Sequence, residues 1–255
     1  LTPRIGQIQY CWRSPTLDIQ QRMYDILRQN AEHAAAVTSC SLSEQWVTKT
    51  RVGLPNNAMA QVTYDNLAEV GPPELDDGAY EFVRDLQENL GVDPMDDPFT
   101  PDATALTDPR EYEANLRTEL PDWQKNFTSD DYVDYTWHAP TVRLYTMTGK
   151  YMLDKPHKTF SYPEWAKNAV AGIPDLTHPG MFVASKTIAG TIVDLLTEDE
   201  YMAAAQDEFE DRTGGGVGGD DWVDPLLPDD FPAQIDLPWP EYVETERGRE
   251  WSLPT

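Results

Sequence analysis

Basic residues are scarce in this sequence. Its 255 residues include 19 Lys and Arg against 45 Asp and Glu, which gives a formal net charge of −26. Without a basic patch to meet phosphate groups, the chain is not expected to bind nucleic acid. The acidic residues are interleaved with aromatic ones rather than gathered in one run, which argues against an acidic tail or a nucleic-acid mimic.

The acidic excess instead predicts a surface adapted to high salt. Asp (27) outnumbers Glu (18), and Arg (12) outnumbers Lys (7). At low ionic strength such a net charge destabilises the compact state through self-repulsion. Salt at about 1 M shortens the Debye length to about 3 Å and removes most of that repulsion. We therefore expect a halophilic protein.

Cysteines and long apolar runs are also few. Cys11 and Cys40 form no CxxC pair, so neither a disulfide scaffold nor a structural zinc site is indicated. No run approaches 18 apolar residues and no signal peptide is visible, so we expect a cytoplasmic protein with no membrane partner. The HExxH, HxD and GxSxG motifs and a phosphate-binding glycine loop are absent. A Ser–His–Asp triad without such a marked nucleophile stays open.

The apolar pattern of the first third predicts a strand–helix–strand unit followed by further helices. Residues 5–12 alternate and carry Ile, Tyr and Trp, which is typical of a strand, and residues 44–52 have the same character. Helical spacing of apolar residues predicts helices over 17–37, 58–70 and 79–90. Because the first predicted strand begins almost at Leu1, we expect a preceding segment to have been removed or separately encoded.

The remaining two thirds have a different organisation. We predict an acidic loop over 91–109, then strands over 132–137 and 141–147, helices over 162–170, 181–196 and 198–212, a flexible glycine run over 214–219 and an extended Pro- and Trp-rich tail over 220–255. The helix over 181–196 has the clearest apolar stripe, with small residues suited to close packing.

Histidines and aspartates are the candidate metal ligands. The four histidines are His33, His138, His157 and His178. His33 lies in an Ala-rich helical segment and is interpreted as an ordinary helix residue. A dinuclear metal site needs several His, Asp or Glu ligands, and a group that could contribute is Asp130, Asp131, Asp134, His157 and His178. The alternative for each aspartate is a solvated surface residue, which this acidic chain has in abundance.

Six short motifs occur in an order that resembles one family. Residues 129–141, SDDYVDYTWHAPT, resemble the segment S-T-D-V-G-D-V-S-W-x-x-P-T of metal-dependent amidohydrolases similar to the B subunit of p-aminobenzoyl-glutamate hydrolase. The other five motifs are Y-C-W-R-S-P-T at 10–16, L-P-N at 54–56, G-P-P-E at 71–74, K-P-H-K at 155–158 and H-P-G-M with A-S-K-T-I-A at 178–189. The resemblance covers about residues 4–212.

The resemblance implies an α/β (α+β) fold, the C-terminal part of a two-domain, zinc-peptidase-like amidohydrolase. Residues 1–92 would be the remainder of an inserted strand–helix–strand dimerisation domain, which pairs subunits and makes a homo-oligomer the expectation. Residues 93–213 would be the C-terminal part of the catalytic domain, and 214–255 an extended tail. Two divalent ions, zinc or manganese, are the expected cofactors.

The same resemblance assigns roles to individual residues. It places His157 at the last metal ligand, and Asp131 and Asp134 in the acidic segment beside the site, with His138 adjacent to it. His178 matches a histidine at a helix N-terminus, a position that favours anions such as a substrate carboxylate. Val133 replaces the family's glycine, and Thr159-Phe160 stand where a Trp is expected.

No catalytic residue is assigned within this chain, because the family's other metal ligands and its Glu general base precede the matching segment. We therefore expect hydrolysis of the amide bond in an N-acyl amino acid or related small amide only when a missing N-terminal segment or partner chain completes the site. The alternatives are a non-catalytic dimerisation or interaction subunit of the same fold, and a salt-adapted structural protein with no site.

Overall fold

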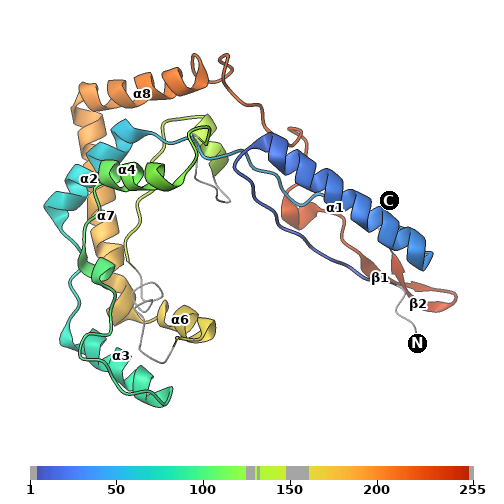
Figure 1. Ribbon diagram of the computed structural model, residues 1–255, viewed down its shortest axis with the longest axis horizontal. Helices are drawn as coiled ribbons and strands as arrows, with labels where there is room; N and C mark the ends of the chain where they lie inside the picture. Colours follow the sequence, from blue (N-terminus) through green and yellow to red (C-terminus); the bar gives the residue numbers. More distant parts are fainter. Residues whose placement is uncertain (1–4, 125–129, 131–132, 148–160, 253–255) are drawn as a thin grey trace. The chain divides into compact units, whose positions relative to one another are not determined.

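The computed structural model describes residues 5–124, 130, 133–147 and 161–252. The chain divides into two compact units (Figure 1). Unit 1 consists of Leu1–Leu54, Asp122–His138 and Thr213–Thr255, and unit 2 consists of Pro55–Pro121 and Ala139–Arg212. Seven α-helices and one two-stranded sheet among the described residues agree with the expected α+β class. The boundaries at 92 and 213 inferred from the sequence stay a prediction.

The main helix of unit 1, α1 (Leu17–Thr38), begins and ends at well-formed caps. Its N-cap, Thr16, accepts a hydrogen bond from the Ile19 amide, which satisfies one of the free N–H groups of the first turn. Its C-cap, Ser39, adopts a left-handed conformation with φ of 55°. The predicted helix over 17–37 is confirmed. None of its residues is buried.

Three aromatic rings hold extended chain against α1. Trp12 stacks on Tyr24 of α1 with ring centroids 6.1 Å apart, and Trp46 lies 4.9 Å from Tyr24 and 5.3 Å from Trp12. The Lys49 ammonium lies 3.9 Å from the centre of the Trp46 ring, a cation–π contact. The Tyr24 hydroxyl bonds Glu44, and this bond together with burial raises the pKa of the phenol. These rings give α1 its tertiary contacts in place of buried aliphatic residues.

The C-terminal segment forms a β-hairpin that the sequence interpretation left as an extended tail. Strand β1 (Glu241–Thr245) pairs antiparallel with β2 (Gly248–Ser252). Tyr242 lies opposite Trp251 and their rings stack at 3.8 Å, the type of cross-strand pair that stabilises isolated hairpins. Gly248, the first residue after the two-residue turn, has a φ of 104°, which favours glycine. The turn residues are charged rather than Asn-Gly, so the usual hairpin signal is missing.

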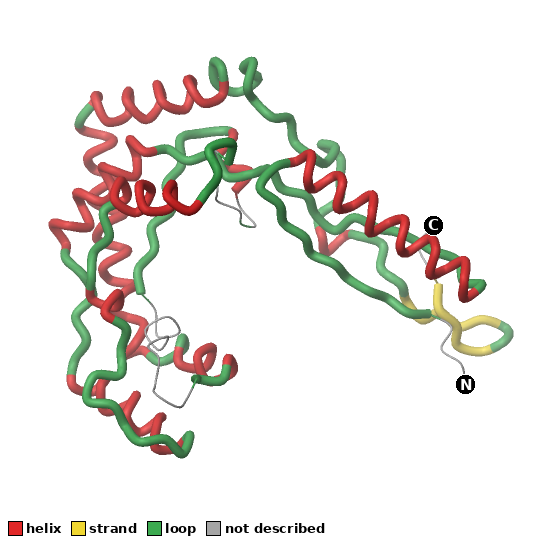
Figure 2. Tube along the Cα trace, in the orientation of Figure 1, coloured by secondary structure: helices red, strands yellow, loops and turns green. Residues whose placement is uncertain are grey.

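The predictions of strands over 5–12, 44–52, 132–137 and 141–147 are wrong for the residues that the structure describes. Residues 5–12 and 44–52 run as extended chain on either side of α1 in the sequence, and no described residue pairs with them in a ladder (Figure 2). Residues 133–137 form a short 3-10 helix, η2 (Val133–Trp137), and 141–147 are loop. Alternation gives a segment two faces, but a strand also needs a neighbour for its N–H and C=O groups.

Unit 2 is helical. Its elements are α2 (Asn57–Val70), α3 (Asp77–Asn89), η1 (Pro101–Thr104), α4 (Pro109–Glu119), α6 (Glu164–Val170), α7 (Pro174–Thr197) and α8 (Asp199–Thr213, whose last residue belongs to unit 1). The predicted helices over 58–70, 79–90, 162–170 and 198–212 are confirmed. The sequence interpretation missed α4, although Asp108 caps it and Pro109 occupies its first position.

The hydrophobic core of unit 2 lies where α3 meets the start of α7. Its buried members are Ala79, Val83, Phe99, Ala103, Tyr162, Val170 and Leu176. Gln87, also buried, donates to the Tyr162 hydroxyl at 2.6 Å and accepts from the Met95 amide at 2.8 Å. Burial raises the pKa of the Tyr162 phenol. The core therefore fixes Tyr162, which lies five residues after His157 in the sequence.

Helix α7 packs along α2 through small residues (Figure 1). Asn66 of α2 donates to the Asp194 carboxylate of α7 at 2.6 Å. A Cβ at Gly190 would lie 2.1 Å from the Asn66 side-chain oxygen, and a Cβ at Gly180 would lie 2.3 Å from the Met147 carbonyl oxygen. The two glycines thus permit close approach of α2 and of residues 141–147. The helix begins at Pro174, seven residues before the predicted start.

The N-terminus of α2 is capped from two directions. Asn56 accepts from the Met59 amide at 2.9 Å and donates to the Ala205 carbonyl of α8 at 2.8 Å. Glu208 of α8 accepts from the Ala58 amide at 2.8 Å. Burial raises the pKa of the Glu208 carboxyl, but bonds from the Asn57 and Ala58 amides and from Arg212 outweigh burial, so the pKa lies below its ordinary value.

By length and composition alone, α7 is also apolar enough to cross a membrane. This is weak evidence, because core helices of globular proteins satisfy the same criteria. Within unit 2, α7 packs against α2 and α3.

Replacing Gly180 by Ala should lower the free energy of unfolding of unit 2 by about 2 kcal/mol, because the new methyl group meets backbone that cannot move easily. Gly190→Ala is the matched variant. It meets the end of the Asn66 side chain, which can rotate away, and Ala itself favours the helix by up to about 1 kcal/mol, so the loss should be smaller. Chemical denaturation followed by circular dichroism measures both, and an equal loss would contradict this account.

Glu208→Gln should reduce the acid sensitivity of unit 2. The folded-state pKa of Glu208 lies below the ordinary 4.5. The ionised carboxylate therefore stabilises the fold above pH 4.5, by about 1 kcal/mol, as other helix caps do. This contribution is lost as the pH falls through the pKa that Glu208 has in the folded state. Unfolding free energies of the wild type and the variant, measured between pH 7 and pH 3, should converge towards low pH. Asp207→Asn, on the exposed side of α8, should leave the wild-type pH profile unchanged.

Candidate functional site

A buried arginine organises the part of unit 1 that contains Asp134 and His138. The Arg51 side chain is 1% exposed, at the end of the extended segment that follows α1. Its Nε donates to the Asp134 carboxylate at 2.7 Å, and its Nη1 donates to the Val223 carbonyl at 2.7 Å. Its Nη2 donates to the Asp134 carbonyl at 3.3 Å and faces His138 Nε2 at 3.0 Å. All three nitrogens of the guanidinium are therefore used.

Helix η2 presents Asp134 to this arginine. The Asp134 carboxylate also accepts from the Arg51 backbone amide at 3.2 Å, so one carboxylate fixes both the main chain and the side chain of residue 51. Thr136 accepts from the Leu54 amide at 2.9 Å, and Trp137 donates from its indole to the Val52 carbonyl at 2.7 Å. The stretch 51–54 is thus bound to η2 by side chains rather than by a β ladder.

Two tryptophans enclose the guanidinium. The Arg51 guanidinium carbon lies 5.6 Å from the Trp137 ring centre and 5.5 Å from that of Trp222, both within the range of cation–π attraction. The Trp222 indole donates to the Trp137 carbonyl at 2.6 Å. Cationic charge in a water-poor environment needs such compensation, and here it is supplied by a carboxylate, carbonyls and π faces together.

His138 contacts both the guanidinium of Arg51 and the ring of Trp222. A guanidinium has donors only, so the 3.0 Å contact is a hydrogen bond when Nε2 carries the lone pair and Nδ1 carries the proton. The ring meets Trp222 edge-on at 5.8 Å. In this arrangement Nε2 of His138 is engaged with Arg51, and the ring supports Arg51 and Trp222.

Of the remaining predicted site residues, His178 lies among those that the structure describes. His157 and Asp131 lie outside the described residues. His178 is exposed in the second turn of α7, rather than before its first residue as expected, and its ring lies 5.8 Å from that of Phe182. Asp134 and His138 are brought together by Arg51. Over the described ranges, no group of three or more His, Cys, Asp or Glu residues could hold a metal ion.

Arg51 and Trp222 are the members of this cluster that the sequence reasoning missed. Arg51 lies within the stretch 44–52 that we predicted as a strand, where an arginine is normally a surface residue. Trp222 belongs to the segment that we interpreted as a tail. The SDDYVDYTWHAPT motif did single out Asp134 and His138, but nothing in it indicates that their common partner is 83 and 87 residues away.

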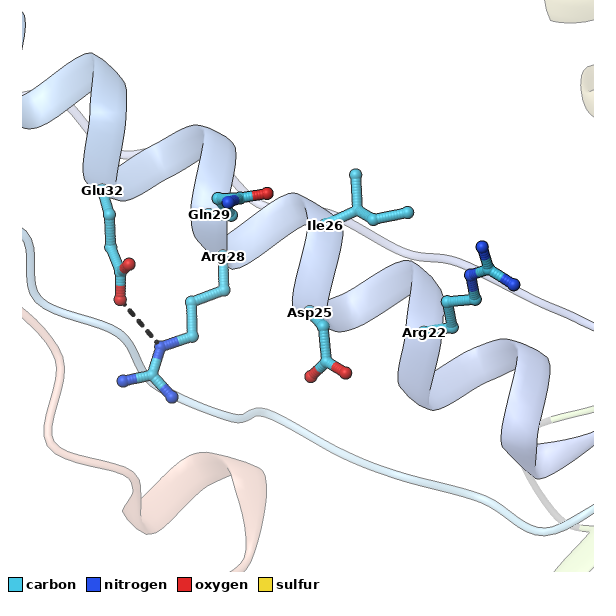
Figure 3. Close-up of a pocket in the computed structure, with 6 residues that line it drawn as sticks. All are labelled: Arg22, Asp25, Ile26, Arg28, Gln29 and Glu32. Atoms are coloured by element: carbon cyan, nitrogen blue, oxygen red, sulfur yellow. Dashed lines mark hydrogen bonds and ion pairs between the residues drawn. The ribbon is translucent and has the colours of Figure 1, made fainter.

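A shallow depression on α1 is the other candidate surface, with a volume of about 470 Å³. Figure 3 shows its six lining side chains on successive turns of that one helix, with Arg28 paired to Glu32 at 3.2 Å. The members are Arg22, Asp25, Ile26, Arg28, Gln29 and Glu32. Mixed charges on a single helix face, without a second wall, are typical of a solvated surface rather than a binding site.

Asp134→Ala should destabilise unit 1 by about 2 kcal/mol, because it leaves a buried guanidinium without its counter-charge. Urea denaturation followed by tryptophan fluorescence measures the loss, since Trp137 and Trp222 flank the charge. Asp229→Ala, at an exposed position, is the matched control and should change stability by less than about 0.5 kcal/mol. Equal stability of the two variants would show that the cluster does not hold unit 1 together.

Comparison with known proteins gives one informative similarity. No protein-family model and no solved structure matches the chain. The chain is 22% identical over 227 residues to the B subunit of p-aminobenzoyl-glutamate hydrolase of Escherichia coli (strain K12). The match covers 84% of this chain and 46% of the relative, so the chain spans about half of the relative's length. The similarity supports a distant amidohydrolase-like relationship and suggests an enzyme.

Proposed function

We propose that this chain is part of a metal-dependent amidohydrolase that cleaves the amide bond of an N-acyl amino acid or a related small amide. The observation that carries the proposal is the similarity to the B subunit of p-aminobenzoyl-glutamate hydrolase, which runs through most of the chain. The ordered motifs of the sequence support the same relationship.

In this proposal the chain forms only part of the active site. The match spans less than half of the relative, and the described residues contain no group able to hold a metal by itself. The missing ligands and the general base would come from a preceding segment or a partner chain. The relative is by name one subunit of a hydrolase, which is compatible with a partner chain.

His157 is the residue proposed to hold one of two divalent ions, zinc or manganese. A dinuclear centre supplies a water whose pKa is lowered towards neutrality and Lewis-acid stabilisation of the developing oxyanion. The described residues support the segments on either side of this position. Met147 contacts Gly180 of α7 before it, and Tyr162 bonds Gln87 of α3 after it.

The Arg51 cluster has a positioning role in the same proposal. Asp134 is three residues from Asp131, the proposed site-adjacent carboxylate, and its bonds to Arg51 fix η2. His138 completes the cluster from the other end of η2. His178, exposed on α7, is the proposed contact for a substrate carboxylate. The salt-adapted surface, the homo-oligomer and the cytoplasmic location are further parts of the proposal.

The second candidate function is a non-catalytic interaction subunit on the same fold. The relative is by name one subunit of a hydrolase, which is compatible with a chain that acts through its partner. The two candidates differ in one measurable property, the dependence of metal binding on this chain's own histidine.

His157→Ala in the complete assembly should remove one bound metal ion and lower kcat/KM for an N-acyl amino acid by more than about 100-fold, since loss of a metal's outer partners alone costs about 10–100-fold. Elemental analysis and a hydrolysis assay measure the two effects. His33→Ala, on the exposed helix α1, is the matched control and should change neither. Unchanged metal content in His157→Ala would favour the interaction subunit.

A further inference from the structure

Helix α7 has a covered face, which packs within unit 2, and an exposed apolar face on the opposite side. The covered face meets α2, α3 and Met147, and its buried residues are Leu176, Gly180, Val183, Thr187 and Thr191. The opposite side of the helix carries larger apolar residues, and these are exposed: Met181 (54%), Phe182 (62%), Ile188 (49%), Ile192 (51%), Val193 (56%) and Leu196 (76%). We call these six residues the outer face of α7.

The outer face is unusual for a surface helix. A surface helix of a globular protein has one apolar stripe and a polar opposite side, whereas a helix that is apolar all round is normally covered on both sides. Here the residues with more apolar surface are the ones in contact with water. All six residues are about half exposed or more, and together they give one side of the helix a continuous row of apolar surface.

Charge on the helix argues against a lipid occupant. Lys186 is exposed on the same side of the helix as the outer face, and Asp194 follows one turn beyond Gly190. Ionised residues in the middle of a segment facing hydrocarbon are costly. Asp194 instead bonds Asn66 of α2, as expected of a helix inside a protein.

A second copy of the chain is a weaker candidate for this face. The homo-oligomer of the proposed function pairs through the inserted domain over residues 1–92, and α7 lies outside that range. The curated relative, by contrast, is more than twice as long as the region that matches this chain. The proposed function requires a polypeptide equivalent to the relative's other half, and this polypeptide is therefore the occupant that we consider.

We propose that the outer face of α7 is the docking surface for the polypeptide equivalent to the half of the relative that lies outside the match. This inference rests on the proposed function, which requires such a polypeptide, and adds where it binds. The occupant presents an apolar surface to Met181, Ile188 and Ile192, with an oxygen acceptor opposite Lys186. It belongs either to the same polypeptide or to a separate chain, and both sources present the same surface.

Site-specific photo-cross-linking tests this docking surface. A benzophenone amino acid replaces Phe182 or Ile192, one at a time, in the protein made from its complete gene in its natural host. After irradiation, mass spectrometry identifies the cross-linked peptides. Both positions should cross-link to a segment that aligns with the unmatched half of the p-aminobenzoyl-glutamate hydrolase relative. An intramolecular product places that segment in the same polypeptide, and a product of higher mass places it in a separate chain.

The matched control is the same amino acid at Ile235, which is 88% exposed in unit 1 and should give no such product. Cross-links from α7 to a second copy, to other residues of this chain or to lipid would overturn the proposal, as would the absence of any product. Because the readout needs no catalysis, an inactive protein with the expected cross-links would reject the proposed function and keep the docking surface.

A double variant provides a second measurement. Ile188→Asp with Ile192→Asp should weaken retention of the other polypeptide at least about 10-fold, because it places charges at the centre of the interface. Ile235→Asp is the control, and it should leave retention unchanged. For a covalently continuous protein, the corresponding measurement is hydrogen exchange of α7, which should accelerate by a similar factor. No change in either measurement would contradict the docking surface.

Discussion

The buried guanidinium of Arg51 is the constraint on which the contacts among residues 51–54, η2 and Trp222 depend. A cation removed from water needs compensation, and this one receives it from a carboxylate, two carbonyls, an imidazole and two indole rings. Those groups come from helix η2 and from the segment after α8, whereas Arg51 itself belongs to the segment after α1. The charge of one side chain thus connects three segments that are far apart in the sequence.

The SDDYVDYTWHAPT motif acquires a clearer physical meaning from this arrangement. It suggests a metal site by its acidic residues and its histidine. In the structure, Asp134 and His138 serve Arg51, and Trp137 bonds the Val52 carbonyl. The part of this motif that the structure describes therefore fixes the backbone of η2. Asp131 keeps its proposed place beside the metal, and His157 is the proposed ligand, carried by a segment whose two flanks are well supported.

Unit 2 depends on close helix packing and leaves apolar surface uncovered. Gly180 and Gly190 allow α7 to approach residues 141–147 and α2, and the Asn66–Asp194 bond fixes the α2–α7 pair. The side of α7 that takes part in this packing is mainly small and polar, so its larger aliphatic residues remain outside. In the proposed function, an incomplete active site and an incompletely covered helix have the same explanation, which is that the matched region is about half of a relative-sized protein.

The amino-acid sequence by itself determined the helices. In α1, α2, α3, α6 and α8, apolar spacing and cap residues such as Thr16 and Asn56 act within a few positions of the chain, so the information is local. The sequence also contains the ordered motifs that resemble the amidohydrolase family, with which the 22% identity to one such relative agrees. Only the tertiary structure decided that residues 5–12 and 44–52 form no ladder, that Tyr242 meets Trp251, and that Arg51 is the partner of Asp134. The physical reason is that strand pairing and buried-charge compensation depend on groups distant in sequence, and a local pattern shows what a residue can do but not which partner it will meet.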